Sequence, residues 1–283
     1  MSLCIDLHTH STASDGTLAP AALVERAHAR GVQVLALTDH DETLGLAEAD
    51  ARARELDIIF VPGVEVSVTW EQRTLHIVGL GIDPGHEALN QGLASIRAGR
   101  GTRAQEMARR LEKLGFADAY EGALQFVSNP ALISRTHFAR FLVQQGHCPN
   151  MQKVFDRFLG DGKPADVPVQ WAALEDAVGW IRAAGGRAVI AHPGRYRLGS
   201  RQATRLYRQF RAIGGCSIEV ITGSHSPTQF LTYARVARSH GFRASLGSDF
   251  HAVDDGRRDL GELPALPADL VPVWEGWFED EQA

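Results

Sequence analysis

The sequence predicts an α/β fold, and three observations lead to that prediction. Short apolar runs rich in β-branched residues alternate along the chain with amphipathic stretches of helical period. The chain has 283 residues, which suits one large barrel with an inserted subdomain better than two unrelated domains. Histidines and carboxylates recur where the apolar runs end, which is the edge at which α/β barrels build their sites. We therefore expect a barrel of parallel strands joined by helical crossovers.

The expected elements follow from these patterns in chain order. The strands are predicted at 3–7, 32–37, 58–61 continuing through 64–68, 75–80, 188–191, 217–221 and 244–246. Helical patterns lie between them at 20–29, 44–56, 174–184, 202–213 and 228–240. Gly31, Gly214 and Gly241 stand just after three of these patterns, where helices commonly end.

One long stretch breaks the alternation of strands and helices. Between about 97 and 171 the apolar residues follow helical spacing, at 103–114, 130–145 and 151–158. We interpret this stretch as a helical insertion, residues 97–171, that caps the mouth of a barrel formed by residues 1–96 and 172–283. An ordinary second domain without a role in the site is the alternative.

Composition and charge limit the classes of function. Hydrophobic residues make up 44% of the chain, charged residues 22%, and the net charge is −5, which argues against a general nucleic-acid coat protein but leaves a local basic site open. The three cysteines, Cys4, Cys148 and Cys216, are far apart and predict neither a disulfide framework nor a zinc ribbon. No leader-like start and no long apolar stretch are found, so we expect a soluble cytoplasmic protein without membrane contact.

The first predicted strand carries the strongest chemical signal, Asp6-Leu7-His8-Thr9-His10. Side chains alternate along a strand, so Asp6, His8 and His10 share one face. Two imidazoles and a carboxylate at one strand end form half of a metal site. Buried histidines bonded to the backbone are the alternative.

Further histidines and carboxylates follow the other predicted strands. They are Asp15, His40, Glu65, His76, His192, Glu219, His225, Asp249 and His251. Imidazole and carboxylate ligands suit Mn, Fe or Zn, and closely spaced ions of this kind serve phosphoester hydrolysis. Glu65 is suited to bridge two ions because each of its oxygens can take one. The joint pattern predicts a metal-dependent hydrolase with two or three divalent ions.

Five motifs resemble those of the PHP (polymerase and histidinol phosphatase) domain family, within the amidohydrolase superfamily. They are Asp6-Leu7-His8-Thr9-His10, Thr38-Asp39-His40, Gly63-Val64-Glu65, Ala191-His192-Pro193 and Ser248-Asp249-Phe250-His251. The resemblance covers nearly the whole chain and implies a distorted (β/α)7 barrel. It also implies three metal positions, held by His8, His10, Glu65 and Asp249, by Glu65, His76 and His192, and by Asp15, His40 and His251. Mn²⁺ is the expected metal, with Zn²⁺ or Fe²⁺ as alternatives.

The third metal position departs from the pattern of the family. Many members with three metals place a histidine where this chain has Asp15. The third ion is therefore expected to bind more weakly than the other two, or to be replaced by a polar contact.

The segment Ser134-Arg135-Thr136-His137 of the insertion suggests a phosphate site, because a guanidinium and a helix N-terminus both favour anions. Within the family, an insertion at this place resembles bacterial nucleoside 3′,5′-bisphosphate phosphatases, which also trim short RNA from the 5′ end. That resemblance implies phosphate contacts from Arg135, His137 and His225.

Arg195-Tyr196-Arg197 directly follows the fifth predicted strand, 188–191. Arg195 and Arg197 could meet a second phosphate, and Tyr196 could stack on a base. Solvated surface residues are the alternative for the arginines.

The predicted reaction is hydrolysis of a phosphomonoester, with Glu65 and Asp249 essential and His225 or His137 as the proton donor to the leaving group. The expected substrate is a small nucleotide or a short RNA rather than duplex DNA, and the oligomeric state is open. Three rival functions stay open: a PHP phosphatase acting on histidinol phosphate, an amidohydrolase cleaving C–N bonds, and a noncatalytic PHP module.

Overall fold

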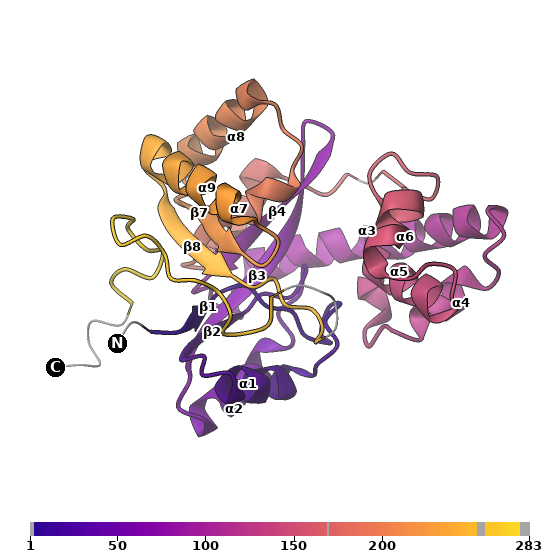
Figure 1. Cartoon of the computed structure of the whole chain (residues 1–283), viewed down its shortest axis with the longest axis horizontal. Coiled ribbons are helices and arrows are strands. Elements are labelled where there is room, and N and C mark those ends of the chain that lie inside the picture. Colours follow the sequence, from indigo (N-terminus) through magenta and orange to yellow (C-terminus); the bar gives the residue numbers. More distant parts are fainter. Residues whose placement is uncertain (1–2, 169, 254–257, 278–283) are drawn as a thin grey trace.

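The strands of the protein form one barrel-like sheet (Figure 1). The computed structural model describes residues 3–168, 170–253 and 258–277. Its strands are β1 (Ile5–Asp6), β2 (Val34–Leu37), β3 (Ile59–Trp70), β4 (Arg73–Leu80), β5 (Ala172–Ala173), β6 (Arg187–Ile190), β7 (Ser217–Thr222) and β8 (Arg243–Gly247). Their order is β1-β2-β3-β4-β6-β7-β8, and the short β5 pairs with β3 outside this path. The predicted α/β barrel is confirmed.

The ends of β1 and β8 draw the two edges of the sheet together. The Leu7 amide donates to the Leu246 carbonyl at 3.1 Å, the Asp249 amide to the His8 carbonyl at 2.8 Å, and the His10 amide to the Phe250 carbonyl at 2.9 Å. Backbone groups that would be unpaired at two sheet edges are satisfied in this way. The metal-ligand motifs at both ends of the chain are therefore neighbours in space.

The expectation that every strand is parallel is wrong for β4. This strand runs antiparallel to both β3 and β6, whereas the other paired strands are parallel. The cause is a turn of two residues, Glu71 and Gln72, whose φ values of 46° and 63° are those of a tight hairpin. A connection of two residues can join only antiparallel strands, since a parallel pair needs a long crossover. The strand predicted at 58–61 and continuing through 64–68 is observed as one strand, β3, from Ile59 to Trp70.

Helices surround the sheet and extend from it on one side (Figure 1). They are α1 (Pro20–Ala29), α2 (Leu46–Glu55), α3 (Glu87–Lys113), α4 (Ala119–Leu124), α5 (Arg135–Gln144), α6 (Met151–Val154), α7 (Leu174–Ala183), α8 (Ser200–Ala212) and α9 (Pro227–His240). The helix α1 has the predicted bounds, and α2, α7, α8 and α9 differ from prediction by one or two residues at their ends. No described helix is long and apolar enough to span a membrane.

Two separate hydrophobic cores account for the shape of the chain. The larger fills the barrel and the space beneath its helices, and the smaller lies among α3, α4, α5 and the residues up to Val167. The helix α3 belongs to both, because Leu89 and Ile96 pack on the barrel whereas Met107 and Leu111 pack in the smaller core. Gly92 permits α3 to cross α7 closely, since a Cβ there would lie 2.4 Å from Trp180.

Candidate metal centre

All nine residues predicted as metal ligands lie in one cluster at the mouth of the barrel. The ends of β1, β2, β6 and β8 supply most of them, β3 and β4 supply two from their interiors, and one comes from the loop after β1. Three groups have ligand atoms within 4.8 Å of one another: His8, His10, Glu65 and Asp249; His40, Glu65 and His76; and His10, Asp15, His40 and His251. The first group equals the first predicted set. The other two differ from prediction, because His40 takes the place of His192 beside Glu65 and His76, and His10 joins Asp15, His40 and His251.

Glu65 lies at the centre of the cluster and faces a different set of imidazoles with each oxygen. Its Oε2 atom has nitrogens at 3.0–3.3 Å, and its Oε1 atom has two nitrogens at 2.9 Å. The neighbours of Oε2 are His8, His10 and His40, and those of Oε1 are His76 and His192. This is the arrangement that a carboxylate bridging two ions requires.

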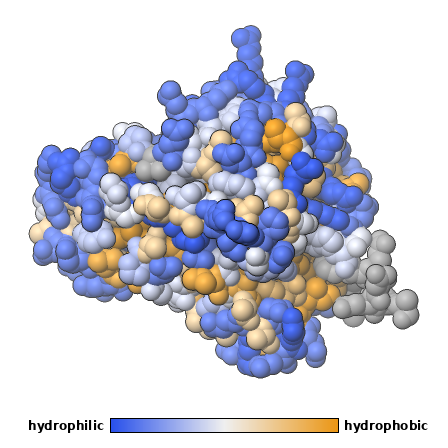
Figure 2. Space-filling view, turned by 180° about the vertical axis from the view of Figure 1, so that it is seen from behind, coloured by the Kyte–Doolittle hydropathy of each residue, from blue (hydrophilic) through white to orange (hydrophobic). Residues whose placement is uncertain are grey.

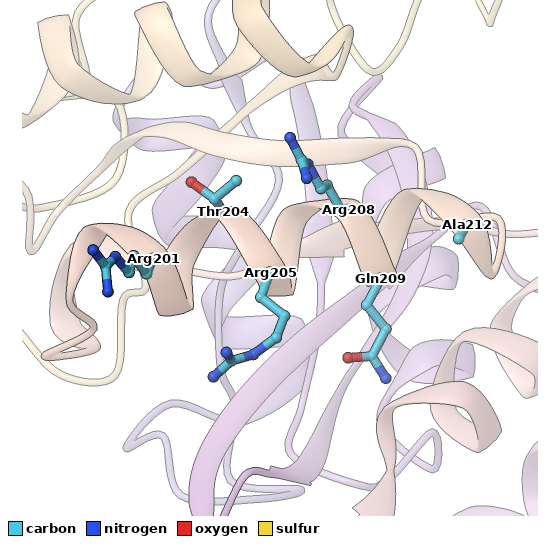
Figure 3. Close-up of a pocket in the computed structure, with 6 residues that line it drawn as sticks. All are labelled: Arg201, Thr204, Arg205, Arg208, Gln209 and Ala212. Carbon is cyan, nitrogen blue, oxygen red and sulfur yellow. The ribbon is translucent and has the colours of Figure 1, made fainter.

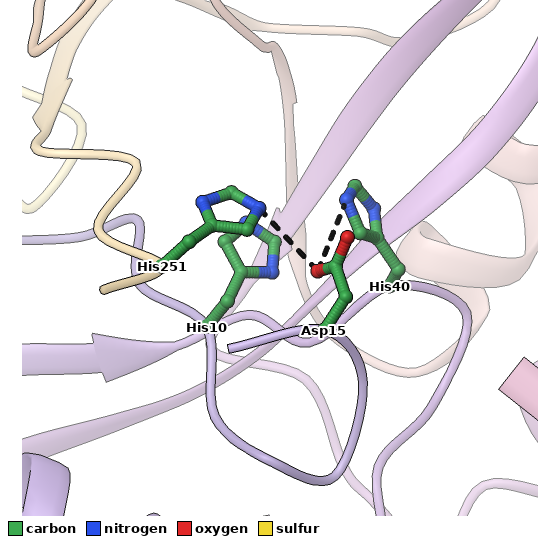
Figure 4. A group of neighbouring side chains, drawn as sticks. All are labelled: His10, Asp15, His40 and His251. Atoms are coloured by element: carbon green, nitrogen blue, oxygen red, sulfur yellow. Dashed lines mark ion pairs between the residues drawn. The ribbon is translucent and has the colours of Figure 1, made fainter. Parts of the chain in front are cut away.

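Asp15 forms a second centre at the outer side of the cluster (Figure 4). Its Oδ1 atom lies 3.4 Å from Nε2 of His251 and 3.8 Å from Nε2 of His40. The Nδ1–H of His251 donates to the Asp249 carbonyl at 2.8 Å, which leaves its Nε2 atom directed at Asp15. Asp15 therefore points toward His40 and His251 as a metal ligand would. Many family members with three metals have a histidine at this position.

Burial and hydrogen bonding in the cluster fit divalent cations. Glu65 Oε2 and Asp15 Oδ1 are buried acceptors without a hydrogen bond, which is costly unless a cation binds them. Burial alone would raise the pKa of both carboxyls, but the surrounding imidazoles hold each well below its ordinary value. Both are thus ready to bind as anions. The donor set, imidazole and carboxylate without cysteine, suits Mn, Fe or Zn.

The histidines of the cluster differ in charge when no metal is bound. Burial lowers the pKa of His10, but the Asp249 and Glu65 carboxylates outweigh it and raise the value to about 9. Burial and Arg195 hold the pKa of His192 well below its ordinary value, so this imidazole is neutral. A metal ion must displace the proton from His10, and binding is therefore coupled to proton release.

Glu219 is a functional residue for which the sequence predicted no role at the metal centre. It lies in β7, where its Oε1 atom accepts from Nδ1 of His8 at 2.7 Å and its Oε2 atom accepts from the His192 amide. A carboxylate behind a ligating imidazole fixes the tautomer and aims the opposite nitrogen at the metal. On the other side, Gly247 lets β8 approach, since a Cβ there would lie 2.2 Å from the His8 Cβ. His8 is thus fixed from two sides.

The loop that carries Asp15 is fixed by a buried carboxylate next to His40. Asp39 accepts from the Ser11 amide at 2.8 Å and from the hydroxyls of Ser11 and Ser14 at 2.6 and 2.5 Å. Because Asp39 follows β2, these bonds tie the loop after β1 to the end of the next strand. The position of Asp15 is therefore set by the barrel.

Two backbone positions at the cluster depart from ordinary strand geometry. Asp249 has φ of 57° and His192 has φ of 25°, values that non-glycine residues rarely adopt. Each directly follows a strand end and turns its side chain into the cluster. Such strain is retained when the surrounding structure enforces it, and it concentrates at functional sites.

The insertion reaches the cluster through the start of α5. The Ser134 hydroxyl donates to Asp15 Oδ2 at 3.3 Å, and Arg140 donates to the Asp15 carbonyl at 2.7 Å. His137 is fully buried, and its Nδ1 atom accepts from the Ser134 amide at 2.9 Å. Its proton is consequently on Nε2, which has no hydrogen-bond partner among the described residues.

The other predicted substrate residues differ in how near they lie to the cluster. Arg195 donates to Asp249 Oδ2 at 2.7 Å and thus places a positive charge beside a candidate ligand. Arg197 is exposed. Arg135 donates to Asp161 and to the Leu159 carbonyl inside the insertion, so the structure does not bring it into the cluster.

The polar atoms of His225 and Tyr196 form hydrogen bonds to backbone groups of the protein. Nε2 of His225 accepts from the Gly194 amide at 2.9 Å, and its Nδ1–H donates to the Val220 carbonyl at 3.2 Å. Burial lowers the pKa of His225 to about 4. These contacts do not favour His225 as a proton donor. The hydroxyl of Tyr196 accepts from the His76 amide at 2.8 Å, so this residue supports a candidate ligand.

Comparison with known proteins agrees with this geometry. The model of the family described as "PHP domain" matches residues 6–223. The chain is 54% identical over 270 residues to a 3′,5′-nucleoside bisphosphate phosphatase of Chromobacterium violaceum, covering 95% of each chain. It is 43% identical over 278 residues to the 5′-3′ exoribonuclease Rnm of Escherichia coli, covering 98% of this chain and 94% of the relative.

A solved structure resembles the whole chain. It is an amidohydrolase from Chromobacterium violaceum with bound sulfate and no metal, and it superimposes with a TM-score of 0.93 at 52% identity. The comparison covers 96% of this chain and 95% of that one. The family motifs, the barrel and the ligand cluster thus agree, and the chain belongs to the PHP domain family.

Proposed function

We propose that this protein hydrolyses nucleoside 3′,5′-bisphosphates to 5′-mononucleotides and inorganic phosphate, and trims short 5′-phosphorylated RNA in the 5′-to-3′ direction. The observation that carries the proposal is Glu65, whose two oxygens face separate sets of imidazoles. The similarity to a bisphosphate phosphatase and to exoribonucleases over nearly the full chain supports the substrate class. A phosphatase for histidinol phosphate is not favoured, because the relatives that are 43–54% identical over nearly the full chain are a bisphosphate phosphatase and exoribonucleases.

The proposed cofactor is two or three divalent ions per chain, with Mn²⁺ as the first candidate. One ion would be held by His8, His10, Glu65 and Asp249. A second would be held by Glu65 together with His76, His192 or His40. A third would be held by Asp15, His40 and His251. Bound ions of this kind lower the pKa of water and neutralise the charge that develops on a phosphoryl group.

The residues around the ions would orient the substrate and balance its charge. Arg195, which contacts Asp249, adds a fixed positive charge at the cluster where a phosphoryl oxygen can approach. His137 presents a buried Nε2–H at the N-terminus of α5, and burial lowers its pKa to about 4. A neutral imidazole of that kind donates a hydrogen bond to phosphate but is a poor source of a proton. We therefore assign His137 to phosphate binding and leave proton donation to solvent.

Arg135 would need to exchange its partner before it could bind phosphate. Its present partner, Asp161, is 83% exposed, so solvent competes with the ion pair and the exchange costs little. Arg135 on the insertion and the exposed Arg197 on the barrel are then the candidate contacts for a second phosphate. The substrate class and the acidic chain favour small nucleotides or short RNA over duplex DNA, and a cytoplasmic location where these substrates are found.

The test is phosphate release from adenosine 3′,5′-bisphosphate by purified protein loaded with Mn²⁺. AMP, histidinol phosphate and a 5′-phosphorylated RNA oligomer are measured beside it. We expect rapid release from the bisphosphate, slow release from both monoesters, and stepwise shortening of the RNA. Equal rates on AMP and the bisphosphate, or release from histidinol phosphate alone, would refute the proposed specificity.

A further inference from the structure

The helix α8 carries a stripe of arginines that the proposed chemistry does not use. Arg201, Arg205 and Arg208 are all exposed and lie four and three residues apart on the helix. Their backbone positions share one face of α8, but their side chains diverge from it (Figure 3). Together with Thr204, Gln209 and Ala212 they line a shallow depression of about 510 Å³. We call Arg201, Arg205 and Arg208 the α8 stripe.

The positive charge of the α8 stripe is poorly compensated within the protein. Arg205 makes a bidentate ion pair with Glu71 of the β3–β4 turn, at 2.6 and 2.7 Å. Among the described residues, no carboxylate lies within ion-pair distance of Arg201 or Arg208. Like charges at these spacings are unfavourable in a helix, so the stripe is not explained by helix stability. Its excess of positive charge contrasts with the net charge of −5 for the chain.

The stripe is continuous along the chain with the metal centre. Arg195 contacts Asp249 in the cluster, Arg197 is exposed two residues later, and α8 begins at Ser200. In Figure 2 the surface at the top of the view, over α8, is dominated by hydrophilic side chains. Figure 3 shows Arg208 and Thr204 on one side of the helix and Arg205 turned to the other. The arginines of α8 thus follow closely in sequence on Arg195, which contacts the cluster.

We propose that the α8 stripe binds the backbone of RNA whose 5′ end lies in the metal centre. This inference rests on the exoribonuclease part of the proposed function. Arg201 and Arg208 are about 10 Å apart along the helix axis, so each can contact a separate phosphate of one strand. The guanidinium fork matches phosphate oxygens, and the Thr204 hydroxyl between them can donate as well. Such contacts read no sequence, as trimming of varied RNA ends requires.

A nucleoside bisphosphate has no nucleotide strand that continues beyond the metal centre, whereas an RNA oligomer does. The stripe should therefore affect RNA alone, and this difference separates it from the catalytic residues. The test variant is the double substitution Arg201→Gln and Arg208→Gln, which leaves the Arg205–Glu71 pair intact. The matched control is Arg54→Gln with Arg109→Gln, because these arginines are 78% and 54% exposed on α2 and α3.

Binding of 5′-phosphorylated RNA oligomers of 3, 8 and 16 nucleotides is measured by fluorescence anisotropy across a range of salt concentrations, with Ca²⁺ in place of Mn²⁺ to slow turnover. For the longer oligomers we expect the test variant to bind about tenfold more weakly than the wild type. The slope of log affinity against log salt should fall by about 1.4, which is about 0.7 for each lost phosphate contact. The 3-mer and the turnover of adenosine 3′,5′-bisphosphate should be unchanged.

Three results would overturn the inference. The first is RNA affinity and salt slope equal to those of the wild type, and the second is an equal loss in the control variant. The third is wild-type protein that hydrolyses the bisphosphate but neither binds nor trims RNA. That last result would also remove the exoribonuclease part of the proposed function and leave the phosphatase part standing. Circular dichroism and thermal melting of both variants establish that loss of binding is not loss of fold.

Discussion

Charged side chains are arranged differently at the mouth of the barrel and in the helical insertion. At the mouth, buried carboxylates such as Glu65 and Asp15 have oxygens without hydrogen bonds and are surrounded by imidazoles. In the insertion, charged side chains pair at the surface, as Glu106 does with Arg109 and Arg110. The buried carboxylates at the mouth are unfavourable unless cations bind them. The surface ion pairs of the insertion need no further partner. The candidate chemistry therefore belongs to the barrel, and the insertion contacts the cluster itself through the start of α5.

The largest effect should come from the residue at the centre of the barrel cluster. Glu65→Gln keeps the size of the side chain but removes the charge that two ions would share. We expect phosphate release to fall by more than about 10³-fold while the fold is retained, because five imidazoles of the cluster face this carboxylate. Steady-state assays at saturating Mn²⁺ check this, with Glu121→Gln on exposed α4 as the matched control. Full activity of Glu65→Gln with its metals bound would disprove the bridging role.

A smaller effect is expected one step away from the ions. Glu219→Gln leaves an oxygen that can still accept from His8 but removes the negative charge that makes the imidazole a stronger ligand. Such substitutions cost about 10–100-fold in metal affinity or activity. The activity should recover largely at high Mn²⁺, in contrast to Glu65→Gln. A titration of activity against Mn²⁺ measures this, and an unchanged midpoint would show that Glu219 does not act through the metal.

Contact between the two regions can be weakened without changing either core. Ser134→Ala removes the hydroxyl that donates to Asp15. We expect one ion to bind about fivefold more weakly and the remaining ions to bind as before. This is the size expected for the loss of a hydrogen bond to a charged group that is partly exposed. Isothermal titration with Mn²⁺ separates the affinity classes, and Ser239→Ala on exposed α9 is the control. A uniform loss across all classes would place the effect in the fold rather than at Asp15.

The smallest effect concerns stability without metal. Burial raises the pKa of Asp6 from 3.8 to about 6, although hydrogen bonds from Ser248 and His8 lower it. The folded state thus binds this proton more tightly than the unfolded state, so its stability falls as pH rises from about 4 to 6.

Asp6→Asn removes the loss of stability at high pH, and its amide oxygen can still accept from the His8 and Ser248 amides. Metal-free Asp6→Asn should exceed wild type in free energy of unfolding by about 1–3 kcal/mol at pH 7.5, and by less at pH 5. Urea denaturation at both pH values measures the difference. A gap that does not change with pH would contradict the shifted pKa.

The ligand residues could be predicted because their pattern is local. His8 and His10 alternate along one extended segment, and His40, His192, Asp249 and His251 follow apolar runs that end at the same rim. The direction of β4 could not be predicted in this way, since its turn, Glu71-Gln72, contains neither the glycine nor the asparagine that usually marks a positive φ. The role of Glu219 was missed because it lies inside a buried strand, and only its distance to His8 reveals it.

Residues whose partners are distant in sequence were the hardest to interpret. Tyr196 follows the fifth predicted strand and was expected to stack on a base, whereas the contact that the structure shows is between its hydroxyl and the His76 amide, 120 residues away in sequence. His225 was expected at the reacting bond, but backbone groups of Gly194 and Val220 occupy both its nitrogens. Such contacts depend on the closed barrel, which a local pattern does not specify.

The most direct test of a metal centre in the barrel is the metal content of each folded chain after loading with Mn²⁺ and removal of free ions. It is measured by mass spectrometry for the wild type, Asp15→Ala and Glu65→Gln. We predict two to three ions in the wild type, about one fewer in Asp15→Ala, and a larger loss in Glu65→Gln. Fewer than one ion in the wild type, with phosphate release that survives a chelator, would contradict the account.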